Sequence, residues 1–353
     1  MTFTSLPDLA SRALAGSVVH ANDELFAERE NLIKPGPAVA REEFGAKGKV
    51  YDGWETRRRR EPGHDYAIVR LGAPGIVHGV VIDTSWFTGN YPPYASVEAT
   101  GADGYPSPEE LEKADWVTLV PRSALEGDTQ NAFPVGDPQR FTHVRLSIYP
   151  DGGVARFRVH GEPLPDPRLL TGTVDLAALE HGGSVVDCSN MFYASPMNLL
   201  LPGRAQSMGE GWENARRRDD GNDHVTVRLA APGVVRRVEL DTSYFVGNAP
   251  GWARLSAGDV ELVPRTRLQP DTRHLFRVPS PGPVDQVRLD VYPDGGLARL
   301  RVFGEVDPPA LTELAERWLE CLPEQQLQHV LSGAGLPAQL PLAPHALQAL
   351  LGR

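Results

Sequence analysis

Short runs in which apolar and polar residues alternate occupy most of the chain. The segments 66–71 (YAIVRL), 76–85 (IVHGVVIDTS), 143–150 (HVRLSIYP) and 154–161 (VARFRVHG) are rich in Val and Ile and are bounded by Gly, Pro, Asp or Asn. A period of two with β-branched residues is typical of half-buried β-strands. The Pro-Asp-Gly-Gly sequence between the last two segments has the chemistry of a tight turn. We therefore predict an all-β protein.

The same pattern occurs twice, in the same order. Asn31, Trp54 and Tyr149 each open a segment that recurs at Asn198, Trp212 and Tyr292. The offset therefore falls from 167 to 158 to 143 residues, so the first copy carries extra residues near 34–50 and 101–115. Insertions of this kind are typical of surface loops on a shared scaffold. We interpret the chain as two homologous jelly-roll β-sandwich domains, 1–165 and 171–306.

The residues after 307 follow a helical spacing instead. Leu311, Ala315, Trp318 and Leu322 are among the apolar residues that recur every three or four positions, and a second such run follows Pro323. We predict that residues 308–353 form a helical tail, which packs on a domain or on another subunit.

Charge and composition exclude several classes of protein. The chain of 353 residues has a formal net charge of −11, which disfavours binding to nucleic acid or to an anionic membrane. It has no run of 18 apolar residues and no basic N-terminal segment followed by an apolar core. The two cysteines are far apart in sequence and fit neither a disulfide framework nor a zinc site. We predict a cytoplasmic protein without a membrane anchor.

The candidate chemistry begins with two matched arginine runs. Arg58 and Arg59 follow Trp54-Glu55, and Arg216 and Arg217 follow Trp212-Glu213. One interpretation is a solvated edge whose charges discourage pairing with other strands. The alternative is a site for a small carboxylate, which the planar guanidinium group can hold through two parallel hydrogen bonds.

A second matched motif ends a predicted strand in each copy. Asp83-Thr-Ser and Asp241-Thr-Ser are each followed by two aromatic residues and by Gly-Asn, ending at Asn90 and Asn248. These polar groups could form ligand loops, or the aspartates could start Asx-turns while the aromatic residues pack in the core.

Other polar residues fit structural roles better. His64-Asp65 could be a base and the group that orients it, but the second copy has Asn222-Asp223 at these positions, so the two copies cannot share a catalytic imidazole. Arg156 and Arg299 lie inside predicted strands and are expected to flank a sheet.

Together these motifs resemble the allantoicase family. The resemblance rests on D-G-W-E-T-R-R, W-E-x-A-R-R, D-T-x-x-F-x-G-N in both copies and Y-P-D-G-G-[VL]-A-R, and it extends over residues 8–305. This chain departs from the pattern in the additional Arg60 and in Asn214, which replaces Thr56 of the first copy. The resemblance implies two galactose-binding-like jelly rolls, a homo-oligomer such as a hexamer or trimer, and hydrolysis of allantoate to ureidoglycolate and urea.

Residue roles follow from this resemblance as a hypothesis. The expected catalytic carboxylates are Glu55, Asp83, Glu213 and Asp241. The expected substrate-binding residues are Trp54, Arg57, Arg58, Asn90, Trp212, Arg216, Arg217 and Asn248. The duplication allows two equivalent sites, one surviving site or a composite site.

Two questions stay open at the level of the sequence. No metal ligands or cofactor are predicted, although a divalent cation held by the Asp-rich loops is an alternative. The rival function is a non-catalytic tandem jelly-roll module that binds a small carboxylate or a carbohydrate.

Overall fold

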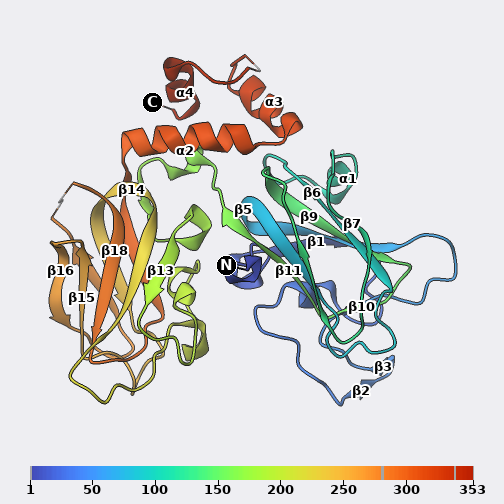
Figure 1. The fold of residues 1–353 in the computed structure, drawn as a ribbon, viewed down its shortest axis with the longest axis horizontal. Coiled ribbons are helices and arrows are strands. Elements are labelled where there is room, and N and C mark those ends of the chain that lie inside the picture. The colour runs from blue at the N-terminus through green and yellow to red at the C-terminus, as the bar shows by residue number, and fades with distance from the viewer. Residues whose placement is uncertain (1, 280–281, 338, 353) are drawn as a thin grey trace. The chain divides into compact units, whose positions relative to one another are not determined.

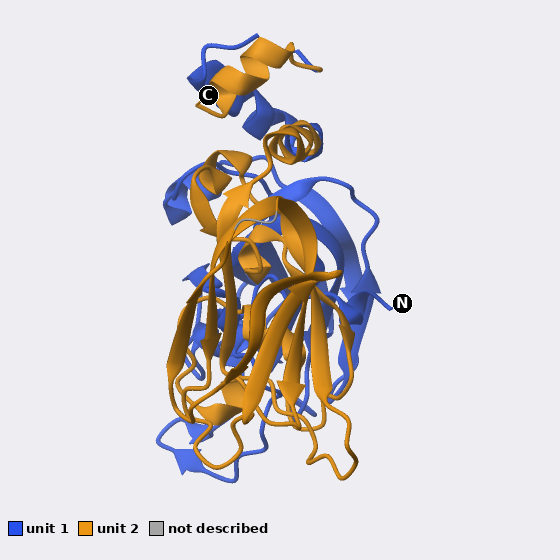
Figure 2. Cartoon of the chain, turned by 90° about the vertical axis from the view of Figure 1, so that its left-hand side faces the viewer, with its two compact units in different colours: residues 1–164, 318–340 blue, residues 165–317, 341–353 orange. Residues whose placement is uncertain are grey.

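The computed structural model describes residues 2–279, 282–337 and 339–352. The chain forms two compact units, each containing one copy of the repeat (Figure 2). The first unit comprises residues 1–164 and 318–340, and the second comprises residues 165–317 and 341–353. Strands dominate both units (Figure 1), so the predicted all-β architecture is confirmed.

The first unit is a sandwich whose strands follow the predicted segments. Its strands are β1 Ser17–Ala21, β4 Trp54–Glu55, β5 Asp65–Asp83, β6 Tyr94–Thr100, β7 Val117–Ala124, β8 Gln130–Pro134, β9 Arg140–Tyr149, β10 Gly153–Val154 and β11 Arg156–Pro163. The two predicted insertions contain the hairpin β2 Phe44–Gly45 and β3 Gly48–Lys49, and the short helix α1 Pro108–Leu111.

One long strand links both layers of this sandwich. The sequence predicts separate strands at 66–71 and 76–85, but the structure has the single strand β5. Its first half pairs with β1 and β9, and its second half pairs with β8 and β11. The pairing with β9 shifts register between Arg70 and Gly75, where Pro74 has no N–H group to donate.

The second unit repeats this plan. Its strands are β12 Thr173–Asp175, β13 Ser184–Cys188, β14 Asp223–Asp241, β15 Trp252–Ala257, β16 Val260–Arg267, β17 Arg273–Arg277, β18 Pro283–Tyr292 and β19 Arg299–Val306. The long strand β14 pairs with β13 and β18 through its first half and with β17 and β19 through its second half. The two copies therefore share one topology.

Helices are short or lie near the C-terminus. The 3-10 helices are Phe3–Ser5, Arg12–Leu14, Arg29–Ile33, Pro167–Leu170, Leu179–His181, Pro196–Leu200 and Met208–Glu210. The predicted tail contains α2 Pro308–Cys321, α3 Glu324–Gly333 and α4 Pro344–Leu350, and its residues are divided between the two units. Among the described residues, no helix has the length and apolar character needed to cross a membrane.

The core of the first unit contains a buried imidazole. His143 on β9 is 2% exposed, and its Nδ1 atom lies 2.8 Å from the hydroxyl oxygen of Thr142. Burial, together with the nearby charge of Arg70, lowers the pKa of His143 to about 4. The second copy has Gln286 at the matched position, where the side chain is exposed. The neutral imidazole is therefore a feature of the first unit.

We expect His143 to make stability depend on pH. Its pKa is lower in the folded protein than its usual value of 6.5, so protonation favours the unfolded chain. The stabilisation is complete above pH 6.5 and is lost as the pH falls toward 4, by about 3 kcal/mol at pH 4. Urea denaturation of wild type and His143→Gln between pH 7 and 4 measures this difference. Parallel pH curves for the two proteins would contradict the expectation.

Candidate active site

The backbone that carries the first Trp-Glu motif is held by a neighbouring segment. The Trp54 indole N–H donates to the main-chain oxygen of Asp23 at 2.8 Å, and the N–H groups of Phe26 and Ala27 donate to the oxygen of Glu55 at 3.2 Å. β4 also pairs with β10, which places Glu55 opposite Gly153. The Glu55 side chain therefore projects from a backbone fixed on both sides.

The second copy reproduces this arrangement. The Trp212 indole N–H donates to the oxygen of Asn190 at 2.8 Å, and the N–H of Tyr193 donates to the oxygen of Glu213 at 3.2 Å. Trp54 and Trp212 expose none of their surface. We predicted both as substrate contacts, but the structure buries both rings beneath the site.

Each glutamate is held by the asparagine that ends the second motif. Asn90 Nδ2 donates to Glu55 Oε1 at 2.7 Å, and Asn248 Nδ2 donates to Glu213 Oε1 at 2.6 Å. The main-chain oxygen of Asn90 accepts from the N–H of Gly153 at 2.8 Å. Gly152 stands beside it with φ of 146°, and a Cβ atom there would lie 2.9 Å from the same oxygen. Only glycine allows the turn to approach Asn90 so closely.

Burial changes the acidity of the first glutamate. Glu55 is partly withdrawn from solvent, and this burial raises its pKa, while the hydrogen bond from Asn90 lowers it in part. A carboxyl group with a raised pKa can both donate and accept a proton near neutral pH.

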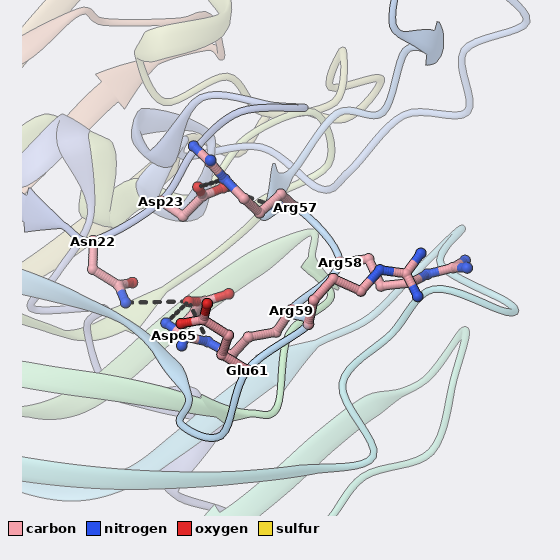
Figure 3. A pocket seen from close by; sticks show the side chains of 8 residues that line it. Asn22, Asp23, Arg57, Arg58, Arg59, Glu61 and Asp65 are labelled. Carbon is pink, nitrogen blue, oxygen red and sulfur yellow. Dashed lines mark hydrogen bonds and ion pairs between the residues drawn. The ribbon is translucent and has the colours of Figure 1, made fainter.

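The arginine run presents alternate side chains to different surroundings. The N–H of Arg59 donates to Asp151 Oδ2 at 2.7 Å, and its side chain donates to Asp65 Oδ1 at 3.0 Å. Asp65 is 2% exposed, so this ion pair anchors the run. Arg58 and Arg60 are exposed and make no hydrogen bond or ion pair with the residues that the structure describes. In Figure 3 the Arg58 side chain points away from Asp65.

The second run alternates in the same way. The N–H of Arg217 donates to Asp294 Oδ2, and its side chain donates to Asp219 and Asp223. Arg217 was a predicted substrate contact, but these carboxylates already occupy its guanidinium group. Arg216 and Arg218 are exposed and have no such partner in the described part of the chain.

Arg57 is exposed like Arg58 and Arg60, but unlike them it is paired with a carboxylate. Its N–H donates to Asp23 Oδ1 at 2.8 Å, and its side chain forms an ion pair with the same carboxylate (Figure 3). The second copy has Asn190 and Ala215 at these positions. Asp23 is not among the predicted residues, because the repeat has Asn190 at the matched position and therefore gives no signal for a carboxylate there.

Two cavities flank the first arginine run. One, of about 490 Å³, is bounded by Asn22, Asp23, Arg57 to Arg60, Glu61 and Asp65 (Figure 3). The other, of about 450 Å³, is lined by Glu55, Arg57, Arg58, Arg60, Asn90, Tyr91 and Asp151 among others, and we call it the Glu55 pocket. It combines free guanidinium groups with a half-buried carboxyl group.

The predicted aspartates lie apart from this pocket. Asp83 is buried and accepts from the N–H of Ser85 at 2.8 Å, and Asp241 accepts from the N–H of Ser243 at 2.9 Å. These contacts are the Asx-turns that the sequence offered as an alternative. Asp83 is not among the residues that line the Glu55 pocket.

The remaining polar residues have structural surroundings. His64 is exposed and its ring packs against Tyr149 at 4.8 Å between ring centroids. Arg156 and Arg299 are buried and donate to main-chain oxygens rather than flanking a sheet at its surface. In the described residues, no three or more His, Cys, Asp or Glu side chains are grouped so that they could hold a metal ion.

Fold and site together define a tandem β-sandwich protein whose first copy has arginine and carboxyl groups lining two pockets. The model of the allantoicase repeat matches residues 7–164 and 174–307. A probable allantoicase of Nocardia farcinica is 59% identical, over 86% of this chain and 95% of its own length. One of Streptomyces avermitilis is 49% identical over 90% of both chains.

A solved structure agrees with these sequences. The crystal structure of allantoicase from Saccharomyces cerevisiae has a TM-score of 0.74 and 34% identity, and the match covers 85% of this chain and 93% of that one. The chain belongs to the allantoicase family.

We expect Arg59 to stabilise the fold and Arg58 not to. Arg59→Met leaves the carboxylate of Asp65 buried without its cation, which is expected to lower the free energy of unfolding by about 2–4 kcal/mol. The matched variant Arg58→Met removes an exposed side chain without partners in the described residues. It should change the free energy of unfolding by less than about 0.5 kcal/mol. Urea denaturation measures both values, and equal stabilities would refute the assignment.

Proposed function

We propose that this protein hydrolyses allantoate to ureidoglycolate and urea, and that the Glu55 pocket carries the reaction. The membership in the allantoicase family supports the activity. The hydrogen-bonded pair of Glu55 and Asn90 in a pocket with free arginines supports the placement, and the matched pair of Glu213 and Asn248 makes the second copy the alternative. We include homo-oligomeric assembly in the proposal, on the family resemblance alone.

The substrate matches the groups around the pocket. Allantoate carries one carboxylate and two ureido groups on a single carbon. Arg58 and Arg60 have no competing carboxylate in the described structure, so each can bind the substrate carboxylate with charge-assisted hydrogen bonds. Glu55 then faces the ureido groups, and its carboxylate oxygens can accept hydrogen bonds from their N–H groups.

Proton transfer is assigned to Glu55. The protonated carboxyl group of Glu55 donates its proton to the nitrogen of the leaving ureido group. The bond between this nitrogen and the central carbon then breaks, and urea leaves. The lone pair of the remaining ureido nitrogen forms the C=N bond of a cationic intermediate. Water then adds to this carbon and returns a proton to the Glu55 carboxylate. The raised pKa of Glu55 favours the acid form that the first step needs.

We expect substitution of Glu55 to separate catalysis from binding. Glu55→Gln keeps the hydrogen-bonding shape but transfers no proton, so kcat for urea release should fall by about 10²- to 10⁴-fold. Glu213→Gln is the matched variant that tests the second copy. Full activity in Glu55→Gln would refute the assignment of Glu55, and loss of activity in Glu213→Gln alone would place the reaction in the second copy. A folded wild type that binds allantoate without releasing urea would favour the binding-module alternative.

Asn90 is expected to influence the pH dependence of kcat through the pKa of Glu55. Its hydrogen bond favours the carboxylate form of Glu55, so Asn90→Ala should raise the Glu55 pKa further. Because the acid form starts the reaction, the alkaline limb of the kcat profile should move to higher pH. A lower kcat with an unmoved limb would show that Asn90 acts only on the fold.

Arg58 is expected to act on binding of the carboxylate. Arg58→Ala should lower kcat/KM by about 10- to 100-fold, mainly by raising KM. Arg236→Ala, which removes an exposed arginine paired with Glu305, is the control. Equal kinetics for both variants would assign the carboxylate to another residue, and Arg216→Ala tests the second copy.

A further inference from the structure

Two buried arginines hold matched loops in the two copies. Arg156 begins β11 and Arg299 begins β19, and they are 2% and 4% exposed. Arg156 Nη1 donates to the main-chain oxygen of Asp52, and Arg299 Nη1 donates to that of Glu210 at 2.7 Å. The Nε atoms donate to the oxygens of Gly36 and Gly203. The two guanidinium groups therefore occupy equivalent settings.

The copies differ in the carboxylate at this position. Arg156 Nη2 donates to Asp52 Oδ2 at 2.7 Å, and this ion pair contributes to lowering the pKa of Asp52 to about 2. The matched residue in the second copy is Glu210, whose carboxylate accepts instead from the N–H of Gln206 at 2.9 Å. Asp52 thus forms an ion pair with its arginine, whereas Glu210 acts on Arg299 only through a longer-range charge interaction.

The outer nitrogen of Arg299 is left without a partner. Arg299 Nη2 makes no hydrogen bond to the described residues, and it is not one of the fully buried unpartnered atoms, so it reaches solvent. Burial and the charge of Arg301 lower the pKa of Arg299 to about 10. The carboxylates of Glu210 and Asp241 raise this pKa in part, but neither forms an ion pair with Arg299 in the described residues, whereas Asp52 pairs directly with Arg156.

We propose that Arg299 Nη2 binds a small carboxylate anion in the second copy, at the place that the Asp52 carboxylate occupies in the first. The aspartate side chain beyond Cα has the size and charge of acetate, which defines the ligand as a carboxylate of that size. Its source is either a free small acid or the carboxylate of the substrate or product.

This site adjoins the second Glu-Asn pair. Glu210 and Met208 belong to the same 3-10 helix, and Met208 Sδ lies 3.1 Å from Asn248 Nδ2. Asn248 holds Glu213. An anion on Arg299 therefore orders a segment that contacts the residue which orients Glu213.

The first test is thermal unfolding in acetate. Sodium acetate at about 100 times its Kd should raise the Tm of wild type by about 5 °C over sodium chloride of equal ionic strength. Acetamide, which has the same shape without the charge, should not. Glu210→Asp supplies the carboxylate within the chain, so it should raise the Tm without acetate and abolish the acetate effect.

Asp52→Ala is the matched variant in the first copy. It removes the carboxylate that pairs with Arg156 and so leaves Arg156 Nη2 without a partner, as Arg299 Nη2 is in wild type. The acetate-dependent increase in Tm should therefore exceed that of wild type. An acetate shift of full size in Glu210→Asp would place the anion elsewhere and overturn the proposal. The absence of any shift in wild type would overturn it as well, whatever Asp52→Ala does.

A binding experiment identifies the source of the carboxylate. Line broadening of ¹³C-labelled acetate by Glu55→Gln protein, which keeps allantoate intact, reports the bound anion. Displacement of acetate by allantoate would identify the substrate as the occupant, and binding of acetate unaffected by allantoate would identify a free acid. Broadening that persists in Glu210→Asp would again contradict the site.

Discussion

The buried carboxylate of Asp65 determines how the first arginine run is displayed. Because Asp65 holds the Arg59 side chain and Asp151 holds its N–H group, the backbone of the run has one orientation. Alternation along an extended chain then sends the neighbouring side chains, Arg58 and Arg60, outward. Asp223 and Asp294 impose the same order on the second run. One internal ion pair thus creates a cationic surface in an acidic protein.

Comparison of the two copies separates what the scaffold needs from what a site needs. The buried tryptophan, the Glu-Asn hydrogen bond and the internally held arginine occur in both copies. The Asp23–Arg57 pair occurs once, and Asn190 and Ala215 replace it together. Loss of both charges leaves no unpaired ion, which explains why the second copy tolerates the change.

The sequence predicts the fold better than the site. Alternation of apolar residues indicates β-strands because it depends on local spacing, and the internal repeat shows directly that the strands are arranged in two copies. The pairing of Asn90 with Glu55 joins residues 35 positions apart, and Asp151 reaches Arg59 across 92 positions. Local patterns contain no information on such contacts, so Trp54, Asp83 and Arg217 were grouped with the exposed arginines.

The long strands β5 and β14 have a consequence for how each unit loses its structure. Each strand contributes hydrogen bonds to both layers of its sandwich, so neither layer has all its strand-to-strand hydrogen bonds unless the shared strand is in place. Separation of the layers requires the shared strand to leave one of them. Each sandwich should therefore lose its two layers in a single cooperative step. The hydrogen bond between Glu55 on β4 and Asn90 on a loop then persists until the whole unit opens.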